Sequence, residues 1–206
     1  MISPNFVRQM AAYDAWQNDN QYAAASGLSE TESRHTRGAF FDRIQATLNH
    51  LIWADMMWMS RIAGTAIPVQ VGVPESVARF EDWPTLTSER LWFDKVIVYW
   101  AAGVSDCDLA GELTFFSSAI GRESKKPRWT CITHMFNHQT RHGGQVHAML
   151  TAAGAKPGDT DLALMTVVCG RPFGPIYRHR RQRHFTNRRY RGSWLRDAGP
   201  YQTRRS

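Results

Sequence analysis

The spacing of histidines is the feature of this sequence that most clearly indicates chemistry. His138 and His142 lie four positions apart in a segment with helical periodicity, so their imidazoles project from one face, one turn apart. This spacing allows two ring nitrogens to bind one divalent ion at about 2.0–2.1 Å. His134 lies one turn earlier and can pair with His138 instead, whereas His147 points away from His142. The segment therefore predicts a helical face that can bind a metal ion.

A third ligand from another helix would complete a site of three histidines. His50 is the candidate, because it lies in an apolar segment where an unpaired imidazole would cost free energy. Three neutral imidazoles leave at least one coordination position for water or substrate, which is typical of a catalytic rather than a structural site. Gln, Thr and Arg separate His138 from His142, so the glutamate of the HExxH protease motif is missing.

These patterns leave a simpler interpretation open. A single histidine on an apolar face is more often a hydrogen-bonded core residue than a metal ligand, and HxxxH on a helix is only moderately specific. The candidates for bonding to the histidine N–H groups are Asp55, Asn49, Asn137 and Gln139. No residue pattern identifies a general base.

The chain around the histidines is predicted to form four long helices. They cover about residues 4–25, 41–63, 87–103 and 129–153. Prolines and glycines make residues 65–84 a long connection, and residues 109–129 are expected to form a short hairpin or irregular crossover. A fifth, short helix is expected over residues 162–168. The predicted fold class is all-α, with a four-helix bundle as its architecture.

Apolar residues at helical spacing predict which face of each helix is buried. On the first helix the expected face consists of Phe6, Met10, Tyr13, Trp16 and Ala24. On the second helix Ile44, Leu48, Leu51, Ile52, Met56 and Met59, together with the polar Asp55, lie on or beside this face. On the third helix it consists of Leu91, Val96, Val98, Tyr99 and Ala102.

The positive charge of the chain is confined to its C-terminal part. The whole chain of 206 residues carries a formal net charge of +7. Residues 171–206 contain eleven arginines, no lysine and one acid, whereas residues 1–170 carry a net charge of −3. This change in composition predicts a domain of residues 1–170 followed by an Arg-rich tail of residues 171–206.

Three interpretations of the Arg-rich tail stay open. It is a passive disordered tail, a nucleic-acid-binding arm with interspersed aromatic rings, or the product of a reading-frame shift near residue 167. A frame shift explains arginine without lysine, mixed with Pro, Gly and His, because an out-of-frame GC-rich gene encodes such a mixture. We therefore expect a tail that is disordered or frame-shifted, and nucleic-acid binding is the less favoured interpretation.

The remaining composition excludes several classes of protein. The chain is 43% hydrophobic, which excludes a wholly disordered protein, and no stretch of 18 apolar residues predicts a transmembrane helix. Three scattered cysteines without CxxC spacing argue against a disulfide scaffold and against a cysteine zinc site. Because the N-terminus shows no secretory signal pattern, we expect a cytoplasmic protein that does not bind membranes.

Several motifs resemble the DinB family of damage-inducible metalloproteins, which are unrelated to the DNA polymerase of the same name. The motifs are residues 38–41 (GAFF), 47–51 (TLNHL) with Ala54 and Asp55, and 134–147 (HMFNHQTRHGGQVH). The resemblance spans about residues 3–168. It implies a four-helix bundle in up-down-down-up order, often dimeric, with a divalent metal ion, most often zinc or nickel, held by three histidines. Carried over by position, these ligands are His50, His138 and His142.

The sequence departs from the family pattern in two places. The family often has His at the position of Arg141 and Arg at the position of Gly143, so a cation that could bind an anionic substrate is missing here. A glycine inside a helix costs about 1 kcal/mol relative to alanine, so we expect Gly143 and Gly144 to be tolerated for close helix packing. Family members also usually end shortly after a short apolar helix, where this chain has the Arg-rich tail.

The wider superfamily includes transferases and isomerases that use mycothiol, bacillithiol or glutathione, although most members of this branch have no assigned reaction. The resemblance therefore implies a metalloenzyme of the thiol-dependent S-transferase or hydrolase type, with a small-molecule substrate, a low-molecular-weight thiol as co-substrate and a homodimeric assembly. Two alternatives stay open: a metal- or ligand-binding bundle without catalysis, and nucleic-acid binding through the tail. Whether the protein is an enzyme is not decided by its sequence.

Overall fold

The computed structural model describes residues 1–66, 72–117 and 120–165. The chain divides into two units, Met1–Thr166 and Val167–Ser206, and all described residues belong to the first. The Arg-rich tail of residues 171–206 lies outside the described residues, so the two-domain division and the disordered or frame-shifted tail stay predictions.

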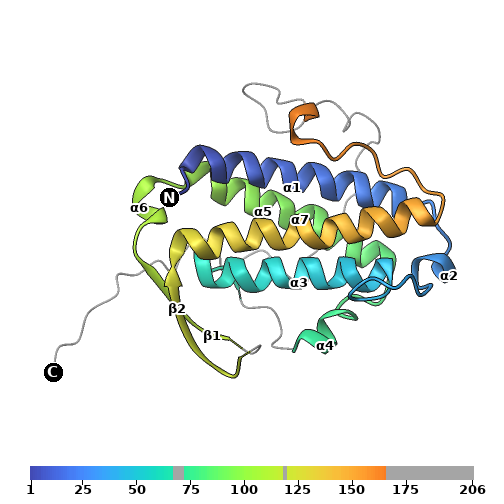
Figure 1. Ribbon diagram of the computed structural model, residues 1–206, viewed down its shortest axis with the longest axis horizontal. Coiled ribbons are helices and arrows are strands. Elements are labelled where there is room, and N and C mark those ends of the chain that lie inside the picture. Colours follow the sequence, from blue (N-terminus) through green and yellow to red (C-terminus); the bar gives the residue numbers. More distant parts are fainter. Residues whose placement is uncertain (67–71, 118–119, 166–206) are drawn as a thin grey trace, which may run out of the picture. The chain divides into compact units, whose positions relative to one another are not determined.

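Four long helices make up most of the first unit. They are α1 (Pro4–Ala25), α3 (Ile44–Ala63), α5 (Trp83–Gly103) and α7 (Arg128–Ala152). The four helices lie side by side, with α7 packed against α3 and α1, and α5 packed against α1 and α3 (Figure 1). The described part of the chain is therefore mostly helical, as predicted, and the up-down-down-up order of a four-helix bundle stays a prediction.

Local sequence signals explain where these helices begin and end. The Ser3 hydroxyl accepts a hydrogen bond from the Phe6 amide and caps α1. Helix α5 begins four residues before the predicted Thr87, because the Asp82 carboxylate accepts from the Thr85 amide and Pro84 is tolerated in a first helical turn. Helix α3 ends at Gly64, whose positive φ of 68° suits glycine.

Shorter elements connect the long helices. They are α2 (Glu30–Ser33), α4 (Val73–Ser76), α6 (Asp106–Leu109), β1 (Glu112–Ser117), β2 (Arg122–Pro127) and a 3₁₀ turn (Leu162–Leu164). The strands pair antiparallel, which confirms the predicted hairpin before the last long helix. The expected connection of residues 65–84 also contains α4, which the sequence did not indicate. The expected helix of residues 162–168 is one 3₁₀ turn as far as the structure describes it.

The buried faces of the helices agree fully with the prediction only for α3. Its predicted apolar residues are all buried. On α1, the predicted residues Phe6 and Tyr13 are only partly buried, whereas Asp14, Asn18 and Gln21 are buried. On α5 the predicted Tyr99 is 85% exposed, and the buried residues are Leu86, Arg90, Phe93, Asp94, Ile97 and Ala101. The predicted faces of α1 and α5 were therefore only partly right: Phe6, Met10 and Val96 pack against the core, but polar side chains occupy part of the interior.

A buried ion-pair network explains how this polar interior is stabilised. Arg90 is 1% exposed, and its Nη1 lies 2.6 Å from Asp55 Oδ2 while its Nη2 lies 2.7 Å from Asp94 Oδ1. Gln139 donates a hydrogen bond to Asp55, and Asn18 Nδ2 donates to Asp94 at 3.0 Å. Because these residues come from α1, α3, α5 and α7, the network links all four long helices.

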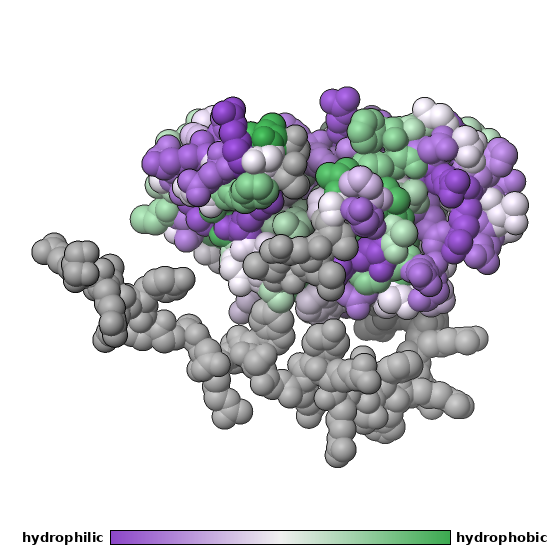
Figure 2. Space-filling model, turned by 90° about the horizontal axis from the view of Figure 1, so that it is seen from below, coloured by the Kyte–Doolittle hydropathy of each residue, from purple (hydrophilic) through white to green (hydrophobic). Residues whose placement is uncertain are grey.

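None of the described helices is both long and apolar enough to cross a bilayer. On the face seen in Figure 2, hydrophobic side chains lie between hydrophilic ones.

Candidate metal centre

Three histidines from α3 and α7 come together as the sequence predicted. One ligand atom from each of His50, His138 and His142 lies within 4.8 Å of the other two, and no other such group of His, Cys, Asp or Glu occurs among the described residues. The Nε2 atoms of His50 and His138 are 3.2 Å apart. Two nitrogens bound to one ion in tetrahedral geometry at 2.0–2.1 Å lie about 3.3 Å apart. The spacing of these rings therefore fits joint coordination of one ion.

The packing of α3 on α7 brings these rings together. His138 and His142 are one turn apart on α7, with ring centroids 4.5 Å apart. The His50 centroid lies 5.1 Å from that of His138 and 5.4 Å from that of His142. The Phe41 ring lies 4.0 Å from His50 and 5.3 Å from His142, so an aromatic side chain covers one side of the cluster.

Hydrogen bonds at Nδ1 determine the tautomers of two of the rings. The Ser76 hydroxyl donates to the Val73 carbonyl at 2.6 Å, so it must accept from Nδ1 of His50, which lies 2.8 Å away. The side-chain oxygen of Gln145 can only accept, and it lies 2.8 Å from Nδ1 of His142. Both rings therefore carry their proton on Nδ1, and Nε2 keeps a lone pair for a ligand bond.

Burial keeps the rings in the neutral form that binds metals. Loss of hydration, followed by the influence of His142, lowers the pKa of His50 to about 4. Loss of hydration and the neighbouring histidines lower the pKa of His138 to about 3. Nδ1 of His138 is buried and has no hydrogen-bond partner in the structure. At neutral pH His50 and His138 are therefore uncharged, which is the form of imidazole that binds a metal ion.

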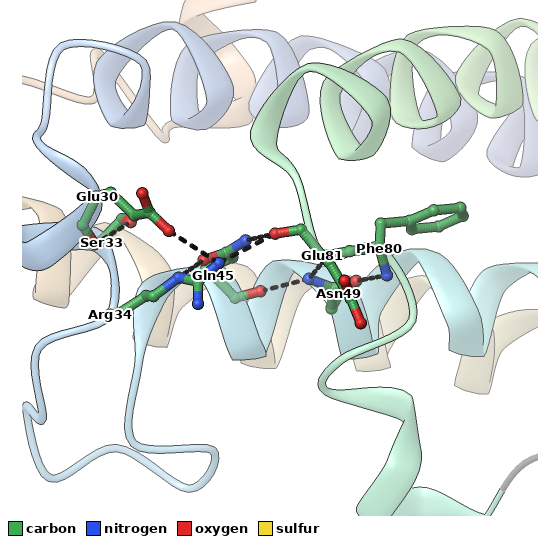
Figure 3. Close-up of polar contacts among 7 residues, drawn as sticks. All are labelled: Glu30, Ser33, Arg34, Gln45, Asn49, Phe80 and Glu81. Atoms are coloured by element: carbon green, nitrogen blue, oxygen red, sulfur yellow. Dashed lines mark hydrogen bonds and ion pairs between the residues drawn. The ribbon is translucent and has the colours of Figure 1, made fainter.

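Hydrogen bonds to Phe80 and Glu81 fix the chain after α4 and so hold Ser76 beside His50. Asn49 Nδ2 donates to the Phe80 carbonyl at 3.1 Å, and the Phe80 amide donates to Asn49 Oδ1 at 2.7 Å. Gln45 and Arg34 both donate to the Glu81 carbonyl, at 2.9 and 3.1 Å (Figure 3). Because Asn49 and His50 are neighbours on α3, these hydrogen bonds position the segment after α4 beside the three histidines.

The predicted partners of the histidine N–H groups were wrong. Asp55 and Gln139 belong to the Arg90 network, and Asn49 binds the backbone of Phe80. Asn137 is exposed. The partners are Ser76 and Gln145 instead. Gln145 could have been found from the sequence, since it lies three residues after His142 on the same helix, but Ser76 lies in a connection without any pattern.

The two other histidines of α7 lie outside the cluster. His134 is exposed, and its ring centroid lies 5.9 Å from that of His138 and 4.9 Å from that of Trp58. His147 lines a separate cavity between α1 and α7. The structure therefore groups His138 with His142 and His50, and not with His134.

A comparison with protein families agrees with the geometry. The model of the DinB family matches residues 1–168. The chain belongs to the DinB family. No curated protein matches the chain. Membership of the DinB family and the group of three histidines are together compatible with a metal-binding protein.

Proposed function

We propose that this DinB-family protein holds one divalent metal ion through His50, His138 and His142. The observation that carries the proposal is the 3.2 Å separation of two Nε2 atoms, together with the tautomers imposed by Ser76 and Gln145. The nitrogen donors suit zinc or nickel. The up-down-down-up order of the helices, a homodimeric assembly and a cytoplasmic location belong to the same proposal.

The proposed reaction is transfer of a thiol to a small electrophile, or hydrolysis of a small-molecule substrate. A bound zinc or nickel ion would lower the pKa of a thiol or water at its open position. The chain contributes the orientation of the three rings, and Phe41 keeps water away from one side of them. Phe40 is 74% exposed, and its ring centroid lies 6.1 Å from that of His142. It offers an apolar surface to a substrate beside the site.

A turnover assay tests this proposal. The full chain loaded with zinc or nickel would be incubated with monochlorobimane and, in turn, mycothiol, bacillithiol or glutathione, and separately with p-nitrophenyl acetate. We expect turnover of one of these substrates by the wild type and loss of that turnover in His138→Ala. Stoichiometric metal without turnover on any substrate would favour a metal-binding bundle without catalysis and would contradict the enzymatic part of the proposal.

Replacing Ser76 by alanine is expected to weaken metal binding about 10–100-fold, because Nδ1 of His50 loses the acceptor that fixes its tautomer. Competition against a chromophoric chelator measures this change. Ser88→Ala on α5 is the matched control, since its hydroxyl donates only to a carbonyl of its own helix. Equal affinities of Ser76→Ala and Ser88→Ala would show that the hydrogen bond does not orient His50.

A further inference from the structure

The cavity lined by His147 lies between α1 and α7 and has a volume of about 310 Å³. Its lining includes Tyr13, Asp14 and Gln21 of α1, Gly144 of α7 and Thr160 of the segment after α7. Ligand pockets in proteins have volumes of about 300–1,000 Å³, so this cavity lies at the lower end of that range and suits a small molecule. None of the three proposed metal ligands lines it.

Several hydrogen-bond donors around this cavity are already used within the protein, although Nδ1 of His147 in the lining is buried without a partner. Gln21 Nε2 donates to the Gly143 carbonyl at 3.1 Å, and Tyr13 donates to the Thr160 carbonyl at 2.7 Å. Gln17 Nε2 donates to the Asp159 carbonyl at 3.0 Å. These bonds use the amide nitrogens of Gln17 and Gln21 within the protein. The amide oxygen of Gln21 is left without a donor.

Two buried acceptors at the cavity lack a partner. Gln21 is 3% exposed, and its Oε1 is buried without a hydrogen bond in the structure. Asp14 is 7% exposed, and no described residue makes a hydrogen bond or ion pair with its carboxylate. An unpaired buried carboxylate is costly, so its position at a cavity indicates a cationic ligand.

The surrounding charges favour a cation as well. Asp14, Asp55 and Asp94 are buried carboxylates, whereas Arg90 is the one buried cation near them among the described residues. Burial, followed by the influence of Asp55 and Asp94, raises the pKa of Asp14 well above its usual value. No lysine or arginine lines the cavity within the described part of the chain. A cation in the cavity would offset the carboxylate charge of Asp14, which burial and the neighbouring carboxylates disfavour.

We propose that this cavity binds a small aliphatic amine as its ammonium ion, with Asp14 as the counterion and Gln21 Oε1 as a second acceptor. An ammonium group supplies up to three donors, which is what an acceptor-lined cavity lacks. A bare metal ion fits less well, because the three carboxylates do not form a metal-binding group and the cavity is about ten times the volume of one water molecule.

The two glycines of α7 shape the cavity in different ways. A Cβ atom at Gly143 would lie 3.2 Å from Gln21 Nε2, so glycine permits the close approach of Gln21 to α7. This confirms the expected close packing at Gly143. A Cβ atom at Gly144 would meet no atom within 4 Å, because it would extend into open space. Gly144 therefore leaves room that a larger side chain would fill.

The test uses thermal unfolding and calorimetric titration of the full chain with n-butylammonium chloride at about 10 mM, well above the dissociation constant of a weak specific ligand. Potassium chloride and 1-butanol at the same concentration control for ionic strength and for apolar binding. The variants are Asp14→Asn, Gly144→Leu and, as the matched control on the same helix, Asp19→Asn, because Asp19 does not line the cavity. Each titration is repeated with His138→Ala, so that the result does not depend on the proposed metal site.

We expect n-butylammonium, but neither control solute, to raise the unfolding temperature of the wild type and of Asp19→Asn. Asp14→Asn should bind at least about tenfold more weakly, since it loses a charge-assisted hydrogen bond, and Gly144→Leu should not bind. Without ligand at about pH 8, Asp14→Asn should unfold about 2–4 °C higher than the wild type, because the buried charge is removed. An equal response of Asp14→Asn and wild type, or no response beyond that to potassium chloride, would overturn the proposal.

Discussion

Replacing Arg90 by methionine is expected to destabilise the protein by about 3–5 kcal/mol, the largest stability effect of any substitution considered. The reason is that Asp55 and Asp94 would lose their ion-pair partner while staying 2% and 5% exposed. Methionine keeps most of the volume of the side chain, so the loss reports on charge rather than on packing. Urea unfolding of the full chain measures the change in the free energy of unfolding.

The loss of unfolding free energy in Arg90→Met should also depend on pH. Burial raises the pKa of Asp94 to about 6, although Arg90 counteracts this effect. In the folded state this carboxyl binds its proton more tightly than in the unfolded state, so its contribution to stability falls as the pH rises from about 4 through 6. Without Arg90 the pKa rises further, and we expect a greater loss at about pH 8 than at about pH 5.

Arg8→Met on α1 is the control for this prediction, because Arg8 is exposed and bonds only to Asn5 and a backbone carbonyl. Its expected cost is below about 1 kcal/mol. If Arg90→Met cost no more than Arg8→Met, or cost the same at both pH values, the buried network would not stabilise the fold in the way described.

Replacing His138 by alanine is expected to weaken zinc or nickel binding at least about 1,000-fold, more than the 10–100-fold typical of losing an outer hydrogen-bond partner. His138 lies between the other two histidines of the cluster, and its Nε2 faces that of His50. Without His138, the remaining ligand nitrogens are those of His50 on α3 and His142 on α7. Competition against a chromophoric chelator measures the affinity.

His134→Ala is the matched control, because His134 lies one turn from His138 on the same helix but outside the cluster. We expect less than about a threefold change in affinity. The opposite order, with a large loss in His134→Ala and retained affinity in His142→Ala, would move the site one turn towards the N-terminus of α7.

The candidate site could be predicted from the sequence because its ligands follow helical periodicity. The four-residue spacing of His138 and His142 places both on one face of α7, and the apolar stripe of α3 places His50 towards the interior. The end of α3 at Gly64 and the hairpin before α7 were also predictable, since glycine and short alternating strands have strong local preferences.

The polar interior could not be predicted in the same way. Arg90 and Asp94 lie four residues apart on α5, and such a pair usually lies on a solvated helix face. Its burial depends on Asp55 and Asn18 from other helices, which periodicity cannot reveal. Ser76 is a similar case, because its place beside His50 depends on hydrogen bonds between α3 and a proline- and glycine-rich connection.

Elemental analysis of the purified full chain tests the central claim most directly. The wild type and the variants His50→Ala, His138→Ala, His142→Ala and His134→Ala would be loaded with zinc or nickel and desalted before measurement. We predict about one ion per chain in the wild type and in His134→Ala, and strong loss in each of the other three variants. Substoichiometric metal in the wild type, or metal retained in His50→Ala and His142→Ala, would contradict the three-histidine site.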